Sequence, residues 1–137
     1  MRKFNIEQIN KNIPISNGFP KEAIKNAYLD IEIGAGTGMF ALGYGRHNPN
    51  RSLISIEKTS NKFRKFQNEF KKGSLSNVFP LHDNGISWVS KYLEESTVDR
   101  YFFLYPNPNP KNKDLNKRFH AMPFMEKVIQ TLKPQGE

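Results

Sequence analysis

A short apolar stretch that runs directly into three closely spaced glycines constrains the fold of this 137-residue chain more than any other feature. Residues Tyr28–Ile33 alternate apolar with acidic side chains, which is typical of a β-strand. Gly34, Gly36 and Gly38 follow, and glycine permits both the positive φ of a tight turn and a close approach of backbone N–H groups to a ligand. The sequence therefore predicts a strand, a glycine turn and a helix that begins at about Met39.

The same order of strand and helix repeats along the rest of the chain. Further strands are expected at residues 53–57, 78–81 and 100–105, and helices at residues 61–70, 86–93 and 121–132. Strands and helices that alternate at this spacing imply right-handed crossovers and a parallel sheet. We therefore expect an α/β fold, a Rossmann-like doubly wound and mostly parallel sheet with helices on both faces, whose ligands bind at the carboxyl ends of the strands.

Residues 21–137 are expected to form a single domain. They contain no repeat, no low-complexity tract and no break in composition that would mark a second domain. Residues 1–20 are rich in asparagine and carry turn signals at Pro14, Gly18 and Pro20. We therefore expect an irregular N-terminal arm before the domain.

The composition excludes several classes of protein. The chain has no cysteine, which excludes a disulfide framework, a thiolate zinc site and covalent cysteine chemistry, and its three histidines lack the spacing of metal ligands. No apolar run approaches the roughly 20 residues of a membrane span, and the first residues lack a secretory signal, so we expect a cytoplasmic protein without membrane contact. The 21 lysines and arginines outnumber 13 acidic residues, and the net charge of +8 favours a polyanionic partner, nucleic acid first.

The spacing of the glycines indicates which cofactor the turn would bind. A dinucleotide fingerprint requires its third glycine one position later, where Met39 stands, so the turn favours S-adenosylmethionine over NAD. Glu57 ends the second strand 23 residues after Gly34, a position from which a carboxylate can accept both hydroxyls of a ribose. Asp83, two residues after the third strand, is placed to accept from an adenine amino group. These positions predict a nucleoside cofactor across the ends of three strands.

The segment after the fourth strand is stiff and basic. Three prolines stand at alternate positions within residues 105–110, and proline restricts the backbone. The cations that follow them are Lys111, Lys113, Lys117 and Arg118. We expect the segment to present these cations beside the cofactor site, with a phosphate backbone as their target.

In order and spacing, these motifs resemble the tRNA (guanine-N7)-methyltransferase family over about residues 29–136. The glycine turn is shared with most S-adenosylmethionine-dependent methyltransferases, whereas the proline segment with its trailing cations points to this family. The motifs that carry the resemblance are Asp30–Gly38, Ile56-Glu57, Leu81–Asp83, Tyr105–Pro108 with Lys111 and Lys117-Arg118, and Leu132–Gly136.

The resemblance implies a class I methyltransferase that uses S-adenosylmethionine to methylate N7 of a guanine in tRNA. Glu32, Glu57 and Asp83 then match cofactor-contacting acids, and Lys111 matches a lysine implicated in RNA binding. Asn107 stands where the family usually has an aspartate at the junction of cofactor and substrate, so it is the expected catalytic and cofactor-binding residue. Here the family's Pro-Asp-Pro-Trp is Pro-Asn-Pro-Asn, which removes a carboxylate and an aromatic ring.

Two other functions fit the same residues. Asn107-Pro108 begins the pattern of methyltransferases that act on an exocyclic amino nitrogen, although Asn109 and Lys111 depart from that pattern. In the second alternative, the chain is a non-catalytic module that binds nucleic acid and keeps the cofactor fold as a scaffold.

The resemblance also bears on how complete the sheet is. In the resembled family, the helix-to-strand connection at Leu132–Gly136 leads to further strands, so the apolar strand at 100–105 would be left as an open edge. We therefore expect either a C-terminally truncated chain or a partner, including a second copy, that covers this edge. Methyl transfer to tRNA is then expected to be weak or absent, even where S-adenosylmethionine binds.

Overall fold

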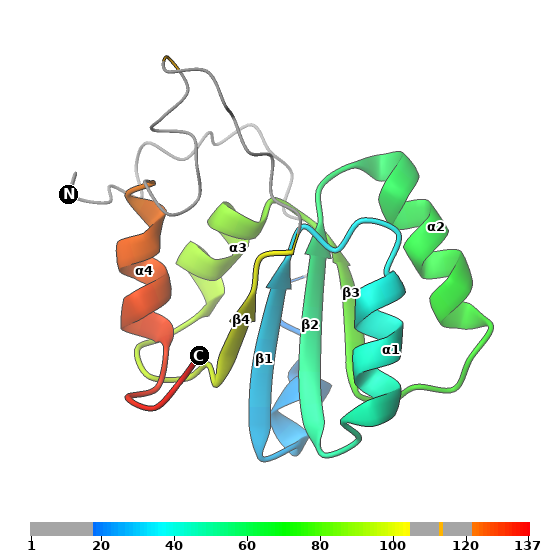
Figure 1. The fold of residues 1–137 in the computed structure, drawn as a ribbon, viewed down its shortest axis with the longest axis horizontal. Helices are drawn as coiled ribbons and strands as arrows, with labels where there is room; N and C mark the ends of the chain where they lie inside the picture. The colour runs from blue at the N-terminus through cyan, green and yellow to red at the C-terminus, as the bar shows by residue number, and fades with distance from the viewer. Residues whose placement is uncertain (1–17, 105–112, 114–121) are drawn as a thin grey trace.

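The computed structural model describes residues 18–104, 113 and 122–137 and contains a four-stranded sheet between helices (Figure 1). Its elements, in chain order, are η2 Lys21–Lys25, β1 Tyr28–Ile33, α1 Met39–His47, β2 Arg51–Glu57, α2 Ser60–Lys71, β3 Val78–His82, α3 Gly85–Tyr92, β4 Arg100–Phe102 and α4 Phe124–Thr131. Every strand and helix expected from the sequence is therefore present. Within the described residues, no helix is long and apolar enough to cross a membrane.

The sheet is parallel, with the strand order β3-β2-β1-β4. The chain builds outward from β1 through β2 to β3, and then crosses to the other side of β1 to form β4. In a doubly wound sheet, ligands bind outside the carboxyl ends of the strands, at the point where the strand order reverses. That point lies here between β1 and β4, and the Rossmann-like α/β fold expected from the sequence is confirmed.

Helices cover both faces of the sheet (Figure 1). On one face, Leu53 and Val78 pack against Ala41 and Leu42 of α1 and Phe66 of α2. The core of the opposite face joins η2, α3 and α4 to the sheet, and its buried side chains include Ala23, Ile31, Ile54, Trp88, Val89, Phe124 and Val128. The regularly spaced phenylalanines of α2 therefore belong to the core, as their helical spacing predicts.

Side chains of the central strand β1 alternate between these two faces. Ile31 and Ile33 belong to the core on the side of α3 and α4. Asp30 and Glu32 therefore point to the side of α1, and both are buried, with 0% and 1% of their surface exposed. The strand thus places two carboxyl groups within the layer between the sheet and α1.

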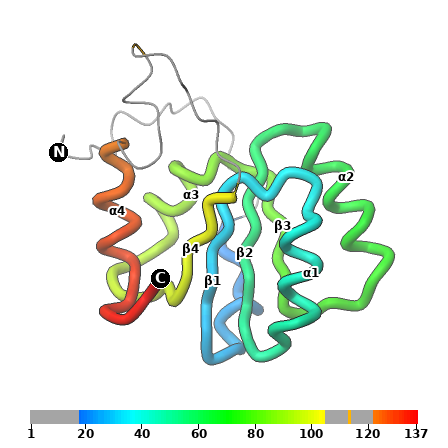
Figure 2. The backbone as a smooth tube through the Cα atoms, viewed as in Figure 1, coloured from blue at the N-terminus to red at the C-terminus, as the bar shows by residue number. Residues whose placement is uncertain are grey.

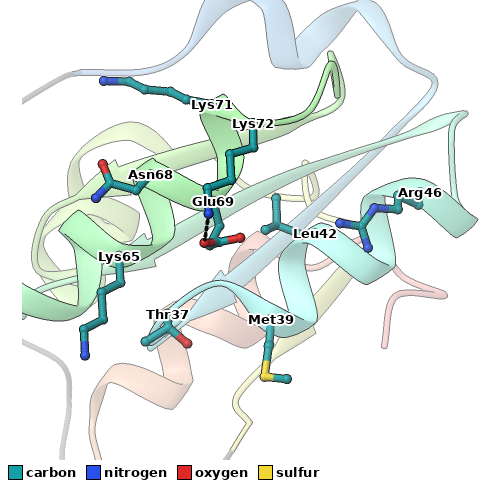
Figure 3. Close-up of a pocket in the computed structure, with 9 residues that line it drawn as sticks. All are labelled: Thr37, Met39, Leu42, Arg46, Lys65, Asn68, Glu69, Lys71 and Lys72. Carbon is teal, nitrogen blue, oxygen red and sulfur yellow. Dashed lines mark hydrogen bonds and ion pairs between the residues drawn. The ribbon is translucent and has the colours of Figure 1, made fainter.

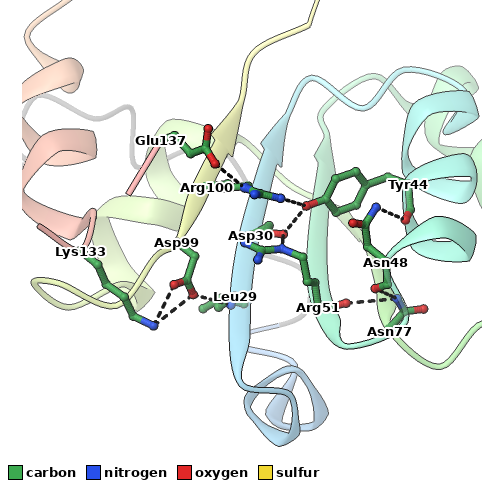
Figure 4. Close-up of polar contacts among 10 residues, drawn as sticks. All are labelled: Leu29, Asp30, Tyr44, Asn48, Arg51, Asn77, Asp99, Arg100, Lys133 and Glu137. Atoms are coloured by element: carbon green, nitrogen blue, oxygen red, sulfur yellow. Dashed lines mark hydrogen bonds and ion pairs between the residues drawn. The ribbon is translucent and has the colours of Figure 1, made fainter. Parts of the chain in front are cut away.

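Asp30 is fully paired (Figure 4). Arg51 on β2 donates from Nε and Nη2 to the two carboxylate oxygens of Asp30, at 2.7 Å each. The hydroxyl of Tyr44 on α1 donates a third hydrogen bond to Asp30 at 2.6 Å, and Arg100 on β4 donates to the Tyr44 hydroxyl at 3.2 Å. This network joins three strands and one helix at the end of the sheet opposite the carboxyl ends of the strands.

Strand β4 differs from the expectation in its length and in its outer edge. It ends at Phe102 and its three residues are half-buried, whereas the sequence predicts a strand that reaches residue 105. The N–H of Glu137 donates to the Asp99 carbonyl at 2.9 Å, and the N–H of Tyr101 donates to the Glu137 carbonyl at 2.7 Å. The edge expected to be open is therefore paired at this point by the backbone of Glu137.

The start of the described chain is packed onto the domain. The indole N–H of Trp88 donates to the Gly18 carbonyl at 3.0 Å, and the Phe19 ring stacks on Trp88 with a centroid separation of 5.8 Å. Trp88 is itself fully buried, which agrees with a core role. Residues 1–17 lie outside the described residues, so the N-terminal arm stays a prediction.

Replacing Arg51 with methionine tests the pairing of Asp30. The change leaves the Asp30 carboxylate buried without its cation, so we expect the free energy of unfolding to fall by about 3–5 kcal/mol. Urea denaturation followed by circular dichroism measures this loss. Lys25→Met is the control, because Lys25 pairs with Glu22 on the surface, where an ion pair contributes about 1 kcal/mol or less. Equal losses in the two variants would contradict this account.

Candidate functional site

A cavity of about 520 Å³ opens at the carboxyl ends of the strands, and this volume is within the usual range of cofactor sites. Glu32, Ile33, Ile56 and Glu57 line it from the strands. The loops that line it are Gly34–Thr37 after β1, Lys58-Thr59 after β2 and Asp83-Asn84 after β3, and the start of α3 adds Gly85 and Ile86. The backbone trace shows these loops gathered at one end of the sheet, as the topology requires (Figure 2).

The glycine turn adopts the conformation that the sequence predicts. Gly34, Gly36 and Gly38 have positive φ values of 82°, 60° and 87°. The N–H groups of Gly34 and Ala35 both donate to the carbonyl of Ile56, at 2.9 and 3.0 Å, which ties the turn to β2. Gly34 and Gly36 line the cavity, so backbone without a side chain faces the space for a ligand.

Gly38 has a different structural role from the other two glycines. It is not among the residues that line the cavity. A Cβ added at Gly38 would lie 1.9 Å from the Phe66 ring, so only glycine allows this close contact between the turn and α2. The close packing of two elements accounts for this glycine.

Glu57 holds the loops after β1 and β2 together through its carboxylate. Its Oε2 accepts a hydrogen bond from the Gly36 N–H at 2.6 Å, and its Oε1 accepts one from the Thr59 N–H at 2.9 Å. The residue is 6% exposed and lines the cavity. Because a carboxylate has about four acceptor positions, roughly two remain for a ligand.

Asp83 forms the third side of the cavity. Its N–H donates to the Glu57 carbonyl at 3.2 Å, and its Oδ1 accepts from the Asn84 N–H at 2.7 Å. The Asn84 side chain in turn accepts from the Ser87 N–H at 3.1 Å and caps α3. Backbone bonds therefore fix the position of the Asp83 carboxylate relative to Glu57.

Glu32 is the most buried of the three acids that line the cavity. Its Oε1 forms no hydrogen bond with any described residue. Burial raises the pKa of Glu32 to about 7, against the opposing effect of the Ser55 hydroxyl and with a further contribution from the charge of Glu57. A buried carboxyl group of this kind can hold a proton near neutral pH or receive a cationic group of a ligand.

The structure brings together five of the residues that the sequence assigns to the cofactor: Glu32, Gly34, Gly36, Glu57 and Asp83. Of the four basic residues assigned to RNA, only Lys113 is described; it is exposed and does not line the cavity. The other assigned residues lie outside the described residues, and their roles stay predictions: Asn107, Lys111, Lys117 and Arg118.

Part of the cavity lining is not predicted from the sequence motifs. Thr59 and Asn84 each stand two residues after the end of a strand, and Ile86 is the second residue of α3, so the rule that ligands bind at strand ends could have pointed to them. Phe40 and Lys62 also line the cavity from α1 and α2. No pattern in the sequence singles them out, because their position depends on how the helices pack on the sheet.

Comparisons with known proteins match most of the chain to methyltransferases. A family model described as "Putative methyltransferase" matches residues 26–137. The tRNA (guanine-N(7)-)-methyltransferase of Staphylococcus aureus (strain MSSA476) is 27% identical over 113 residues, which cover 82% of this chain and 52% of that protein. The chain spans about half the length of the curated relatives it matches. The resemblance stated from the sequence motifs is confirmed.

Solved structures share the fold. A SAM dependent methyltransferase from Aquifex aeolicus has a TM-score of 0.56 at 17% identity, over 83% of this chain and 55% of that chain. Haemonchus contortus phosphoethanolamine N-methyltransferase 2, in complex with S-adenosyl-L-methionine, has a TM-score of 0.62 at 15% identity, over 81% of this chain and 23% of that chain. At such low identity, this likeness establishes the fold alone.

The raised pKa of Glu32 predicts a dependence of stability on pH. The folded chain keeps the Glu32 proton up to a pH of about 7, whereas the unfolded chain loses it near 4.5, so folding takes up a proton between these values. The free energy of unfolding should therefore fall as the pH rises from 5 to 8, by at most about 3 kcal/mol from this group. Urea denaturation across this pH range should show a smaller fall in the free energy of unfolding for Glu32→Gln than for the parent chain.

The exposed Glu94 provides the control for this experiment. In Glu94→Gln, the free energy of unfolding should depend on pH as it does in the parent chain. If Glu32→Gln keeps this dependence as well, the Glu32 carboxyl loses its proton at ordinary pH values and burial does not raise its pKa.

Proposed function

The chain belongs to the methyltransferase family whose model matches residues 26–137, and we propose that it transfers the methyl group of S-adenosylmethionine to N7 of a guanine in tRNA. One observation carries the proposal: Glu32, Glu57 and Asp83 line a single cavity beside the glycine turn, at the ends of three adjacent parallel strands. The names of the curated relatives, tRNA (guanine-N(7)-)-methyltransferases, support the choice of substrate.

The groups that line the cavity fit S-adenosylmethionine. The acceptor positions left on Glu57 would bind the two ribose hydroxyls, and the Asp83 carboxylate would accept from the adenine amino group. The free carboxyl oxygen of Glu32 would face positive charge, since S-adenosylmethionine carries both a sulfonium and an ammonium group. The bare backbone at Gly34 and Gly36 would let the ligand approach closely.

The residues of the chain would act by positioning rather than by proton transfer. When bound, S-adenosylmethionine supplies an electrophilic methyl group. Guanine N7 already carries an in-plane lone pair, so no general base is needed. Glu57 and the turn that it holds would fix the cofactor, and the apolar side chains of Phe40, Ile86 and Leu104 would limit water at the cavity.

Substrate recognition is assigned to the segment after β4 on the basis of its sequence. Asn107 would orient the guanine through its amide, and the basic residues of this segment would contact phosphates. Those residues are Lys111, Lys113, Lys117 and Arg118. Under this proposal the macromolecular partner is tRNA and the compartment is the cytoplasm.

A methyl-transfer experiment tests the activity. The 137-residue chain is incubated with bulk tRNA and with S-adenosylmethionine labelled in its methyl group, and the tRNA is then digested to nucleosides. We expect the label in 7-methylguanosine. Label in an N-methylated exocyclic amine would favour an amino-methyltransferase instead, and cofactor binding without any transfer would identify a binding module.

Glu57→Gln tests the cofactor site. The amide keeps the volume of the carboxylate but replaces one acceptor oxygen with a donor, so charge-assisted hydrogen bonds to the ribose are weakened or lost. In isothermal titration calorimetry, S-adenosylmethionine should bind about 5- to 150-fold more weakly, a loss of about 1–3 kcal/mol. Glu94→Gln, outside the cavity, should bind as the parent chain does. Unchanged affinity in Glu57→Gln would place the cofactor elsewhere.

A further inference from the structure

A second cavity, of about 850 Å³, lies between α1 and α2 (Figure 3). Its cations come from both helices: Arg46 from α1, and Lys65, Lys71 and Lys72 from α2 and the residue that follows it. We call this cavity the basic cleft. Its one acidic residue, Glu69, is already paired with Lys72 at 2.6 Å, so the cleft presents an excess of positive charge.

The charge of the basic cleft belongs to a longer basic segment. Residues 58–72 contain six lysines and arginines and a single glutamate, which gives a net charge of +5 out of the +8 of the whole chain. All six cationic side chains are exposed. Within the part of the chain that the structure describes, Arg46, Lys65 and Lys71 form no ion pair with a carboxylate.

The stability of α2 does not explain this charge. A cation near the end of a helix is favoured by the helix dipole, which accounts for Lys71. Lys62 instead stands in the first turn, where the dipole disfavours a cation, and Lys65 in the middle of the helix gains little from the dipole. The helix dipole therefore accounts neither for Lys62, which lines the cofactor cavity, nor for Lys65, which lines the basic cleft.

The shape of the basic cleft favours an extended anion over a small one. Lys65 and Lys72 are seven residues apart, which corresponds to about 10 Å along the helix axis. Arg46 faces them from α1, and every polar side chain that lines the cleft is exposed. Charge spread over this distance, without a buried polar group to fix one small ligand, suits several successive phosphates of a nucleic-acid strand.

The basic cleft and the candidate cofactor cavity meet at the start of α1. Thr37 and Met39 line both of them, and Met39 is 85% exposed. A strand bound in the basic cleft would therefore run up to the opening of the cofactor cavity. A substrate nucleotide must reach the same place to receive a methyl group.

We propose that the basic cleft binds the phosphodiester backbone of the RNA substrate. The identity of that RNA rests on the proposed function, but phosphate binding at Lys65, Lys71 and Arg46 is a separate property that can be measured without methyl transfer. The assignment adds a second RNA-binding surface, on α1 and α2, to the segment after β4.

The double variant Lys65→Gln, Lys71→Gln tests the basic cleft. Its matched control is Lys21→Gln, Lys91→Gln, which removes the same charge from exposed positions elsewhere and, like Lys71, includes a lysine in the last turn of a helix. The dissociation constant for bulk tRNA is measured between 50 and 300 mM salt, roughly the range in which phosphate contacts dominate. Calorimetry with S-adenosylmethionine is run on both variants.

Loss of two phosphate contacts should weaken tRNA binding roughly tenfold at 0.1 M salt and lower the salt slope by about 1.4–1.8. The control should keep the parent slope, and both variants should bind S-adenosylmethionine normally. Equal tRNA binding by the two variants would overturn the proposal, whether both keep the parent slope or both lose it. RNA binding that depends on the basic cleft but occurs without methyl transfer would support the cleft and contradict the proposed function.

Discussion

Strand β1 buries two carboxyl groups on one face of the sheet, and the molecule accommodates them in opposite ways. Asp30 receives two hydrogen bonds from Arg51 and one from Tyr44, which neutralise its charge and join β1 to β2 and α1. Glu32, nearer the carboxyl end of the strand, has an oxygen without a partner among the described residues and a pKa raised to about 7. The paired acid links neighbouring elements of the sheet, while the other acid, whose burial lowers the free energy of unfolding as the pH rises from about 5 to 8, lies where a ligand could use its charge.

The two cavities differ in charge. Three carboxyl groups and two lysines, Lys58 and Lys62, line the cofactor cavity, whereas four cations and a single glutamate line the basic cleft. The excess of positive charge in the basic cleft would attract a phosphate strand, while the carboxyl groups of the cofactor cavity would face the cationic groups of S-adenosylmethionine. Thr37 and Met39 stand at the boundary because they contribute to both.

Local patterns explain how much of this could be predicted from sequence. Alternating or continuous apolar residues mark the strands, the glycine turn marks the start of α1, and a 3.6-residue period marks α2 and α4. Because a parallel sheet brings strand ends together, these patterns are enough to predict Glu57 and Asp83 at one site. Contacts between distant segments were not predictable in this way. The Phe66 ring leaves no room for a side chain at position 38, and the backbone of Glu137 pairs with β4. Neither contact produces a pattern in the sequence. The basic cleft was missed for the same reason, because it exists only once α1 and α2 lie side by side on the sheet.

The hydrogen bonds of Glu57 link the two cavities mechanically. Its carboxylate already accepts from Gly36 and Thr59, so the loops after β1 and β2 are held in place without a ligand. A loop that is ordered in advance loses less conformational entropy when a ligand binds, which favours affinity. The turn that Glu57 holds continues through Gly38, packed on Phe66, into Met39 and α1, which forms one wall of the basic cleft. Cofactor and RNA would therefore meet at Thr37 and Met39, beside a turn that is held by Glu57 of β2 and packed on Phe66 of α2.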